Sequence, residues 1–76
     1  MSKPKDDLLV KVGDYVRKRA KMKFKSNVDF ASACDVTETT IRRILQGKQN
    51  ISIKLLERIC EALEIKMSDF LRETGN

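Results

Sequence analysis

Apolar residues recur at intervals of three and four along most of this chain, which is the spacing of one face of an α-helix. In residues 37–48, for example, the recurring positions are Ile41, Ile44 and Leu45. No run of alternating β-branched residues breaks this pattern, and the 76 residues include only three glycines and one proline. The sequence therefore predicts an all-α fold.

The apolar stripes predict five helices in one domain. The first helix spans about residues 6–23, with Asp6 and Asp7 complementing the helix dipole in its first turn. Residues 1–5 are expected to form a disordered basic tail. This division leaves residues 6–76 as the folded domain, which is long enough for a single small core.

Polar residues mark the ends of the remaining helices. Ser26, Thr37 and Ser52 each stand where a side-chain oxygen can accept from the free N–H groups of a first turn. Asp35 and Gly47 follow the second and third helices, where a left-handed backbone can end a helix. These signals place the third helix at about residues 38–46.

The core is expected to form from the apolar stripes of all five helices, the last of which is short and lies around Ser68. The residues expected to be buried are Leu8, Val12, Val16, Phe30, Ala31, Cys34, Ile41, Ile44, Leu45, Leu55, Leu56, Ile59, Cys60, Leu63, Phe70 and Leu71. Both cysteines occupy such positions, and we expect them to be packed thiols.

Positive charge is concentrated in the first two-thirds of the chain. Residues 1–48 contain twelve Lys and Arg against six Asp and Glu, whereas residues 49–76 contain four against five. The total is the net charge of +5. This distribution fits a protein that turns one face toward a polyanion, although it also fits a domain that is merely soluble.

Several function classes lack the residues that they need. Two cysteines without any histidine cannot form an ordinary zinc site, and there is no glycine-rich phosphate loop or nucleophile with an evident base. We therefore expect neither an enzyme nor a cofactor, and so small a core leaves no room for a small-molecule ligand. No apolar stretch reaches membrane-spanning length and no signal peptide is evident, so we expect a cytoplasmic protein and no membrane partner.

The predicted third helix has a polar outer face. Its outward positions are Glu38, Thr39, Arg42, Arg43 and Gln46. Such a face offers both hydrogen-bond donors and acceptors, which the reading of base edges requires. The same composition is also that of an ordinary solvated surface helix, and this segment alone does not separate the two interpretations.

From Ser26 to Leu71 the sequence resembles the phage-repressor/Cro-type, or lambda-repressor-like, helix-turn-helix family. The matching positions are spread over about 46 residues, and their joint spacing is more specific than any single one of them. They are Phe30 and Ala31, Val36 and Thr37, Thr40, Ile41 and Ile44, Gly47 and Lys48, Ser52, Leu56, Ile59, Ala62 and Leu63, Met67, Phe70 and Leu71.

The resemblance implies a compact five-helix domain whose second and third helices form the helix-turn-helix, with the third helix in the DNA major groove. Carried over by position, the residues implied to read bases are Glu38, Thr39 and Arg43. Those implied to contact phosphates are Ser26, Asn27, Thr40, Arg42, Lys48 and Gln49. Among the base readers, Arg43 is suited to a bidentate contact with guanine.

The sequence also departs from the family pattern. An Arg late in the first helix and a Glu near the end of the third, which the family often pairs, correspond here to Ala20 and Leu45. Replacing both members of a buried ion pair by apolar residues can be neutral or stabilising, so the fold is expected to be intact. An alignment shifted by one residue would instead place Arg19 in the Arg position and leave only the Glu missing.

The function that the resemblance implies is sequence-specific binding of double-stranded DNA by a small transcriptional regulator, expected to be a repressor. A domain of this size is expected to bind as a homodimer to a palindromic operator with half-sites about 34 Å apart. The residues considered for the dimer contact are Ile65, Met67, Phe70 and Leu71, or alternatively Tyr15 and Leu9 on the first helix. The alternative function is a protein-interaction module, such as an antitoxin of a toxin–antitoxin pair or a restriction–modification controller protein.

Overall fold

The computed structural model describes residues 4–75, with side chains from Leu8 onward. Within this range it contains five helices and no strands: α1 (Pro4–Lys23), α2 (Asn27–Cys34), α3 (Glu38–Leu45), α4 (Ile53–Leu63) and α5 (Met67–Thr74). The predicted all-α class is therefore confirmed. Because α1 already begins at Pro4, residues 4 and 5 of the predicted tail are helical, and residues 1–3 lie outside the described residues.

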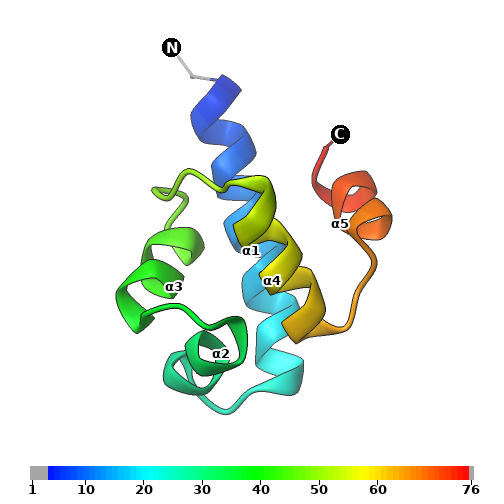
Figure 1. Cartoon of the computed structure of the whole chain (residues 1–76). Coiled ribbons are helices and arrows are strands. Elements are labelled where there is room, and N and C mark those ends of the chain that lie inside the picture. Colours follow the sequence, from blue (N-terminus) through cyan, green and yellow to red (C-terminus); the bar gives the residue numbers. More distant parts are fainter. Residues whose placement is uncertain (1–3, 76) are drawn as a thin grey trace.

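The long helix α1 and the helix α4 form the centre of the domain, as Figure 1 shows. Helices α2 and α3 lie together on one side of this central pair, and α5 lies on the other side. None of the helices in residues 4–75 combines the length and apolar character needed to cross a membrane.

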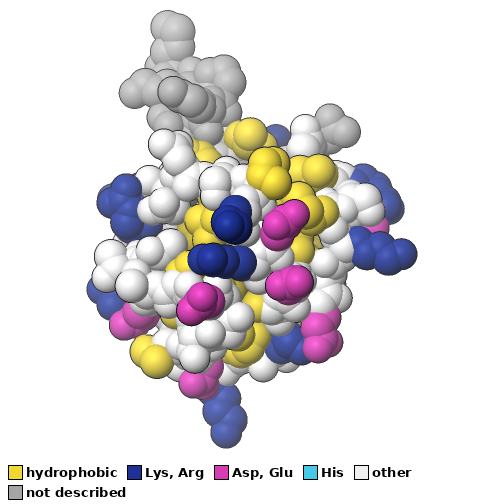
Figure 2. All heavy atoms as spheres, viewed as in Figure 1, with side chains coloured by type: hydrophobic (Ala, Val, Ile, Leu, Met, Phe, Trp, Pro, Cys, Tyr) yellow, Lys and Arg dark blue, Asp and Glu magenta, His cyan; other side chains and the backbone are white. Residues whose placement is uncertain are grey.

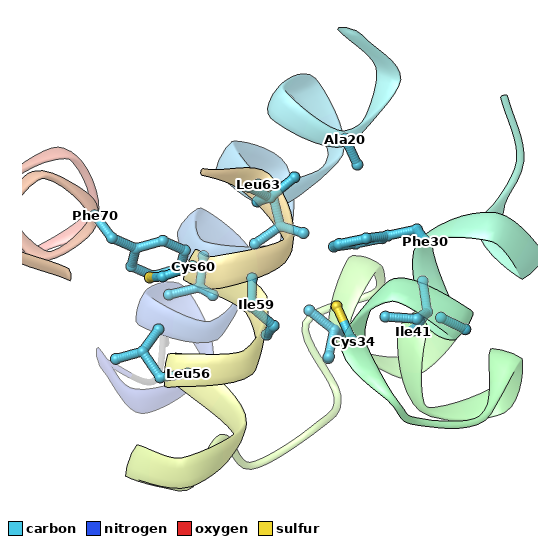
Figure 3. Packing of buried hydrophobic residues seen from close by; sticks show 13 residues of the cluster. Ala20, Phe30, Cys34, Ile41, Leu56, Ile59, Cys60, Leu63 and Phe70 are labelled. Carbon is cyan, nitrogen blue, oxygen red and sulfur yellow. The ribbon is translucent and has the colours of Figure 1, made fainter. Parts of the chain in front are cut away.

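Buried side chains from all five helices form one hydrophobic core. In Figure 3, Ile59 and Leu63 of α4 lie between Phe70 of α5 on one side and Phe30 of α2 on the other. Tyr15 of α1 meets Phe70 edge-on, with ring centroids 5.2 Å apart. The core thus ties the helix pair α2–α3 to α5 through the central helices.

Four expected core positions differ from the prediction. Leu8 and Leu71 are 47% and 53% exposed, and Leu45 and Leu55 are only half-buried. The expectation that Leu8 and Leu71 are buried was therefore wrong. The short helix α5 buries only one face, which carries Phe70 and Thr74, and Leu71 is rotated by about 100° from Phe70 around the helix axis.

The three predicted N-caps are confirmed. The hydroxyls of Ser26, Thr37 and Ser52 accept hydrogen bonds from the third backbone amide that follows, at 3.2, 3.2 and 3.1 Å. Each bond satisfies one of the free N–H groups of a first turn. Local side chains therefore define where α2, α3 and α4 begin.

Left-handed residues end three of the helices. Asp35 has φ 60° after α2 and Gly47 has φ 72° after α3, as expected, and Glu64 has φ 58° after α4, which the sequence did not indicate. After α3, the amides of Gly47 and Lys48 donate to the carbonyls of Ile44 and Arg43, so the chain reverses within two residues. These tight ends fix α3 relative to its neighbours.

Candidate nucleic-acid interface

Helix α3 buries one face and presents the other to solvent. Ile41 and Ile44 are completely buried, whereas Thr39, Arg42 and Arg43 are exposed. The predicted outer face therefore exists, although Glu38 and Thr40, which were also assigned to DNA contacts, are half-buried. What remains open to an approaching molecule is a face on which cations and hydroxyls dominate.

Helix α1 packs closely against the end of α3 because Gly13 has no side chain. A Cβ atom at this position would lie 2.5 Å from the carbonyl oxygen of Ile44 and 3.0 Å from that of Leu45. One turn further along α1, Arg17 donates from Nη2 to the Leu45 carbonyl at 2.9 Å. A cation at this place satisfies a free carbonyl and complements the negative end of the α3 dipole.

The sequence analysis did not identify this role of Arg17. The available signal was the spacing of Gly13 and Arg17, which are four residues apart and therefore share one face of α1. The two residues together set the position of α3 on the body of the domain.

The expected replacement of an ion pair is consistent with the packing. Ala20 and Leu45 line the same hollow between α1, α2 and α3, so the two positions lie near each other. Arg19 lies elsewhere, with its guanidinium 5.8 Å from the centroid of the Tyr15 ring and close to α5. The alternative alignment, with Arg19 opposite Leu45, was therefore wrong.

Arg43 is held by the loop that follows its own helix. Its Nε donates to Oε1 of Gln49 at 3.0 Å, and its Nη2 donates to the carbonyl oxygen of Lys48 at 3.1 Å. Gln49 in turn donates from Nε2 to the carbonyl of Asn50 at 3.1 Å. Bonds within the protein thus orient the side chain of Arg43.

The first turn of α3 has its own pairings. The Glu38 carboxylate lies 3.2 Å from Nη2 of Arg42, and the hydroxyls of Thr37 and Thr40 are 3.0 Å apart. An exposed ion pair of this kind contributes little, typically about 0–1 kcal/mol, and exchanges readily for another partner. Glu38 and Arg42 therefore neutralise each other without being locked in place.

The family of the chain follows from a comparison with known domains. The model of the Cro/C1-type HTH DNA-binding domain matches residues 16–73, which cover the last part of α1, all of α2, α3 and α4, and nearly all of α5. This chain is a Cro/C1-type helix-turn-helix domain. The predicted resemblance is therefore confirmed, with α2 and α3 as the helix-turn-helix.

Solved structures of a gene regulator and of a controller protein share this fold. The chain is similar to the clp gene regulator ClgR of Corynebacterium glutamicum, with a TM-score of 0.81, 25% identity, and coverage of 90% of this chain and 87% of that one. It is also similar to a mutant of the restriction–modification controller protein C.Esp1396I, with a TM-score of 0.74, 26% identity, and coverage of 91% and 97%. Among curated proteins, none matches the sequence at a significant level.

In this Cro/C1-type domain, the start of α2 lies next to the end of α3. Ser26 and Asn27 line the same hollow as Leu45, together with Lys21 and Lys25. Ser26 already uses its oxygen as the cap of α2, but its hydroxyl hydrogen remains available to a phosphate. The phosphate contacts assigned to these two residues remain predictions, as do all the assigned base contacts.

The two cysteines of the domain are packing residues. Cys34 and Cys60 are buried, and burial raises the pKa of the Cys34 thiol to about 11 and that of Cys60 above its ordinary value. Both side chains are therefore neutral thiols at neutral pH. Both belong to the hydrophobic core, Cys34 on α2 and Cys60 on α4.

Proposed function

We propose that this chain is a sequence-specific repressor that inserts α3 into the major groove of duplex DNA. The observation that carries the proposal is the outer face of α3, where Arg43 is held outward by Gln49 and Lys48. A guanidinium can contact O6 and N7 of guanine together, and Thr39 and Glu38 offer a donor and an acceptor beside it. The start of α2, with Ser26, contacts the DNA backbone in this proposal.

We further propose that two copies bind a palindromic operator as a homodimer. In support, an apolar groove runs between α1, the start of α4 and α5, with exposed Leu8 and Leu71 at its edge and Leu9, Val12 and Ile51 in its walls. Figure 2 shows the corresponding apolar area near the top of the domain, between α4 and α5. A two-fold contact through this groove would bury the same leucines from both copies.

The dimer residues named from the sequence contribute unequally to this groove. Phe70 is fully buried in the core of its own chain, and Ile65 and Met67 are half-buried against that core. Leu71 alone among the four is an exposed residue of the groove. The proposal therefore centres the contact on Leu71 of α5 and Leu8 of α1.

Selection of bound duplexes from a random pool tests the proposed function. An inverted repeat with half-sites about one helical turn apart supports a two-fold dimer that reads sequence. Recovery of unrelated sequences, with no common motif, contradicts sequence-specific binding. The repressor assignment is tested separately with a reporter gene placed behind the selected site, whose output should fall when the protein is expressed.

The second candidate function is that of a restriction–modification controller. The similarity to C.Esp1396I over 91% of this chain favours it. This candidate shares the DNA-binding mechanism and differs in the genes that are regulated. Selected sites that lie upstream of restriction or methyltransferase genes in the source genome would support it. We propose that the protein acts in the cytoplasm, where it would meet its DNA target.

A further inference from the structure

We propose that Gln49 is a positioning residue for Arg43, and that it holds the guanidinium ready for a base instead of contacting a phosphate. This inference rests on the proposed DNA-binding function and deepens it. It changes the role that the family resemblance implied for Gln49, which was a phosphate contact. The consequence is that Gln49 contributes to sequence discrimination without touching a base.

The orientation of the Gln49 amide supports this role. Arg43 has only donors, so the amide oxygen of Gln49 must face it, and the bond from Arg43 Nε to Oε1 is 3.0 Å long. The amide nitrogen then donates to the Asn50 carbonyl at 3.1 Å. Both ends of the amide are thus engaged within the protein, and the side chain is half-buried. A dedicated phosphate contact would instead leave the amide group directed into solvent.

The two hydrogen bonds to Arg43 occupy one edge of its guanidinium. Nε and Nη2 form that edge, and they donate to Gln49 and to the carbonyl of Lys48. In residues 8–75, Nη1 has no hydrogen-bond or ion-pair partner. The end of the guanidinium, formed by Nη1 and the second hydrogen of Nη2, is therefore free. Two parallel donors of this kind match O6 and N7 of guanine.

The backbone supports the same arrangement. The Lys48 amide donates to the Arg43 carbonyl at 2.9 Å, as part of the left-handed end of α3 at Gly47. The loop that carries Gln49 is thereby tied to the helix turn that carries Arg43. A long side chain that is already fixed loses less conformational entropy on binding, and this saving corresponds to about a 2- to 12-fold change in affinity.

Four single variants test the inference, each measured by its affinity for the selected operator and for operators with one base pair changed. Gln49→Ala removes the acceptor, and Gln49→Glu keeps an acceptor for Arg43. Lys48→Ala is the matched control, because it removes a neighbouring charge while its carbonyl still holds Arg43. The base pair read by Arg43 is identified with Arg43→Ala.

We expect Gln49→Ala to reduce discrimination at the base pair read by Arg43 by about 2- to 12-fold. Gln49→Glu should lower affinity for all duplexes but retain more of this discrimination than Gln49→Ala. Lys48→Ala should weaken all duplexes alike. In the Arg43→Ala background, Gln49→Ala should have no further effect on discrimination.

A uniform loss of affinity in Gln49→Ala, or no loss at all, overturns the inference while leaving the proposed function standing. Equal loss of discrimination in Gln49→Ala and Gln49→Glu also overturns the inference. The acceptor that Gln49→Glu retains for Arg43 would then have no effect on discrimination. If the wild-type protein binds every duplex equally, the proposed function itself fails. NMR of the free protein adds an independent test, in which the Arg43 Nε–H should exchange faster with water in Gln49→Ala than in the wild type.

Discussion

Arg43 and Lys48 are joined by a reciprocal pair of hydrogen bonds. The Lys48 amide donates to the Arg43 carbonyl at 2.9 Å, and Nη2 of Arg43 donates to the Lys48 carbonyl at 3.1 Å. The first bond ends α3 at the left-handed Gly47, and the second turns the Arg43 side chain along the loop. The end of α3 and the orientation of the Arg43 side chain are therefore coupled. A change in the loop is expected to alter where the Arg43 guanidinium points.

The position of α3 depends on the missing side chain of Gly13. Gly13→Ala adds a Cβ that would lie 2.5 Å from the Ile44 carbonyl oxygen and push α1 from α3, at a packing cost of about 1–3 kcal/mol. Because alanine gains about 1 kcal/mol over glycine inside a helix, we expect a net destabilisation of up to about 2 kcal/mol. Urea unfolding measures the difference, with Lys11→Ala on the exposed face of α1 as the control. Unchanged or increased stability in Gly13→Ala would show that the contact is not tight.

Arg17 should stabilise the end of α3. Arg17→Met removes the donor to the Leu45 carbonyl and should cost about 1 kcal/mol of unfolding free energy. Lys21→Met is a charge-matched control from the same helix, and we expect it to have little effect. The comparison can be made by thermal unfolding of both variants at the same salt concentration. If the two variants lose equal stability, the loss is caused by the removal of a positive charge and not by the loss of the hydrogen bond to the Leu45 carbonyl.

The apolar groove should hold the homodimer together. Leu71→Glu places a charge in the proposed contact of both copies and should weaken dimerisation by roughly 1.5–3 kcal/mol per copy. The control is Met22→Glu, because Met22 is 82% exposed and lies outside the groove. Sedimentation equilibrium should give a monomer for the first variant and a dimer for the second. A dimer in both variants would place the interface elsewhere.

The buried thiols should make stability depend on pH in the alkaline range. The pKa of Cys34 rises from its ordinary value of 9.0 to about 11 in the folded chain, because burial disfavours the thiolate. The unfolded state therefore releases its proton first, and stability should fall as pH increases from about 9 to about 11. Urea unfolding at pH 8 and pH 10 measures this fall, and Cys34→Ala should reduce it. Equal pH dependence in both proteins would contradict the assignment to Cys34.

Local signals explain why much of the fold was predictable from the sequence. Ser26, Thr37 and Ser52 cap helices through bonds to residues three positions away, so their roles depend on nearby sequence alone. The stripe containing Ile41 and Ile44 likewise identifies the inner face of α3, and Asp35 carries the left-handed turn where the sequence placed it.

The remaining features depend on contacts between distant residues. Arg17 meets Leu45 across 28 positions in the sequence, and no local pattern specifies that pairing. The exposure of Leu71 depends on which face the short helix α5 turns toward the core. In so short a helix, the spacing of apolar residues does not define that face sharply. The bond between Arg43 and Gln49 spans a loop whose course depends on the left-handed Gly47. From the sequence, Arg43 could be assigned to α3 and Gln49 to the loop after it, but their hydrogen bond could not be predicted.

Binding of the wild-type protein and Arg43→Ala to the selected operator tests the central claim most directly. Fluorescence anisotropy would compare that operator with duplexes in which one base pair is changed, over a range of salt concentrations. We predict that the wild type binds selectively and more weakly at higher salt, and that Arg43→Ala loses about 1–3 kcal/mol of discrimination at one base pair. Arg43→Lys keeps the positive charge but not the two parallel donors of the guanidinium, so it should lose that discrimination too. Undiminished discrimination in Arg43→Ala, or equal affinity of the wild type for every duplex, would contradict the claim that Arg43 on α3 reads DNA sequence.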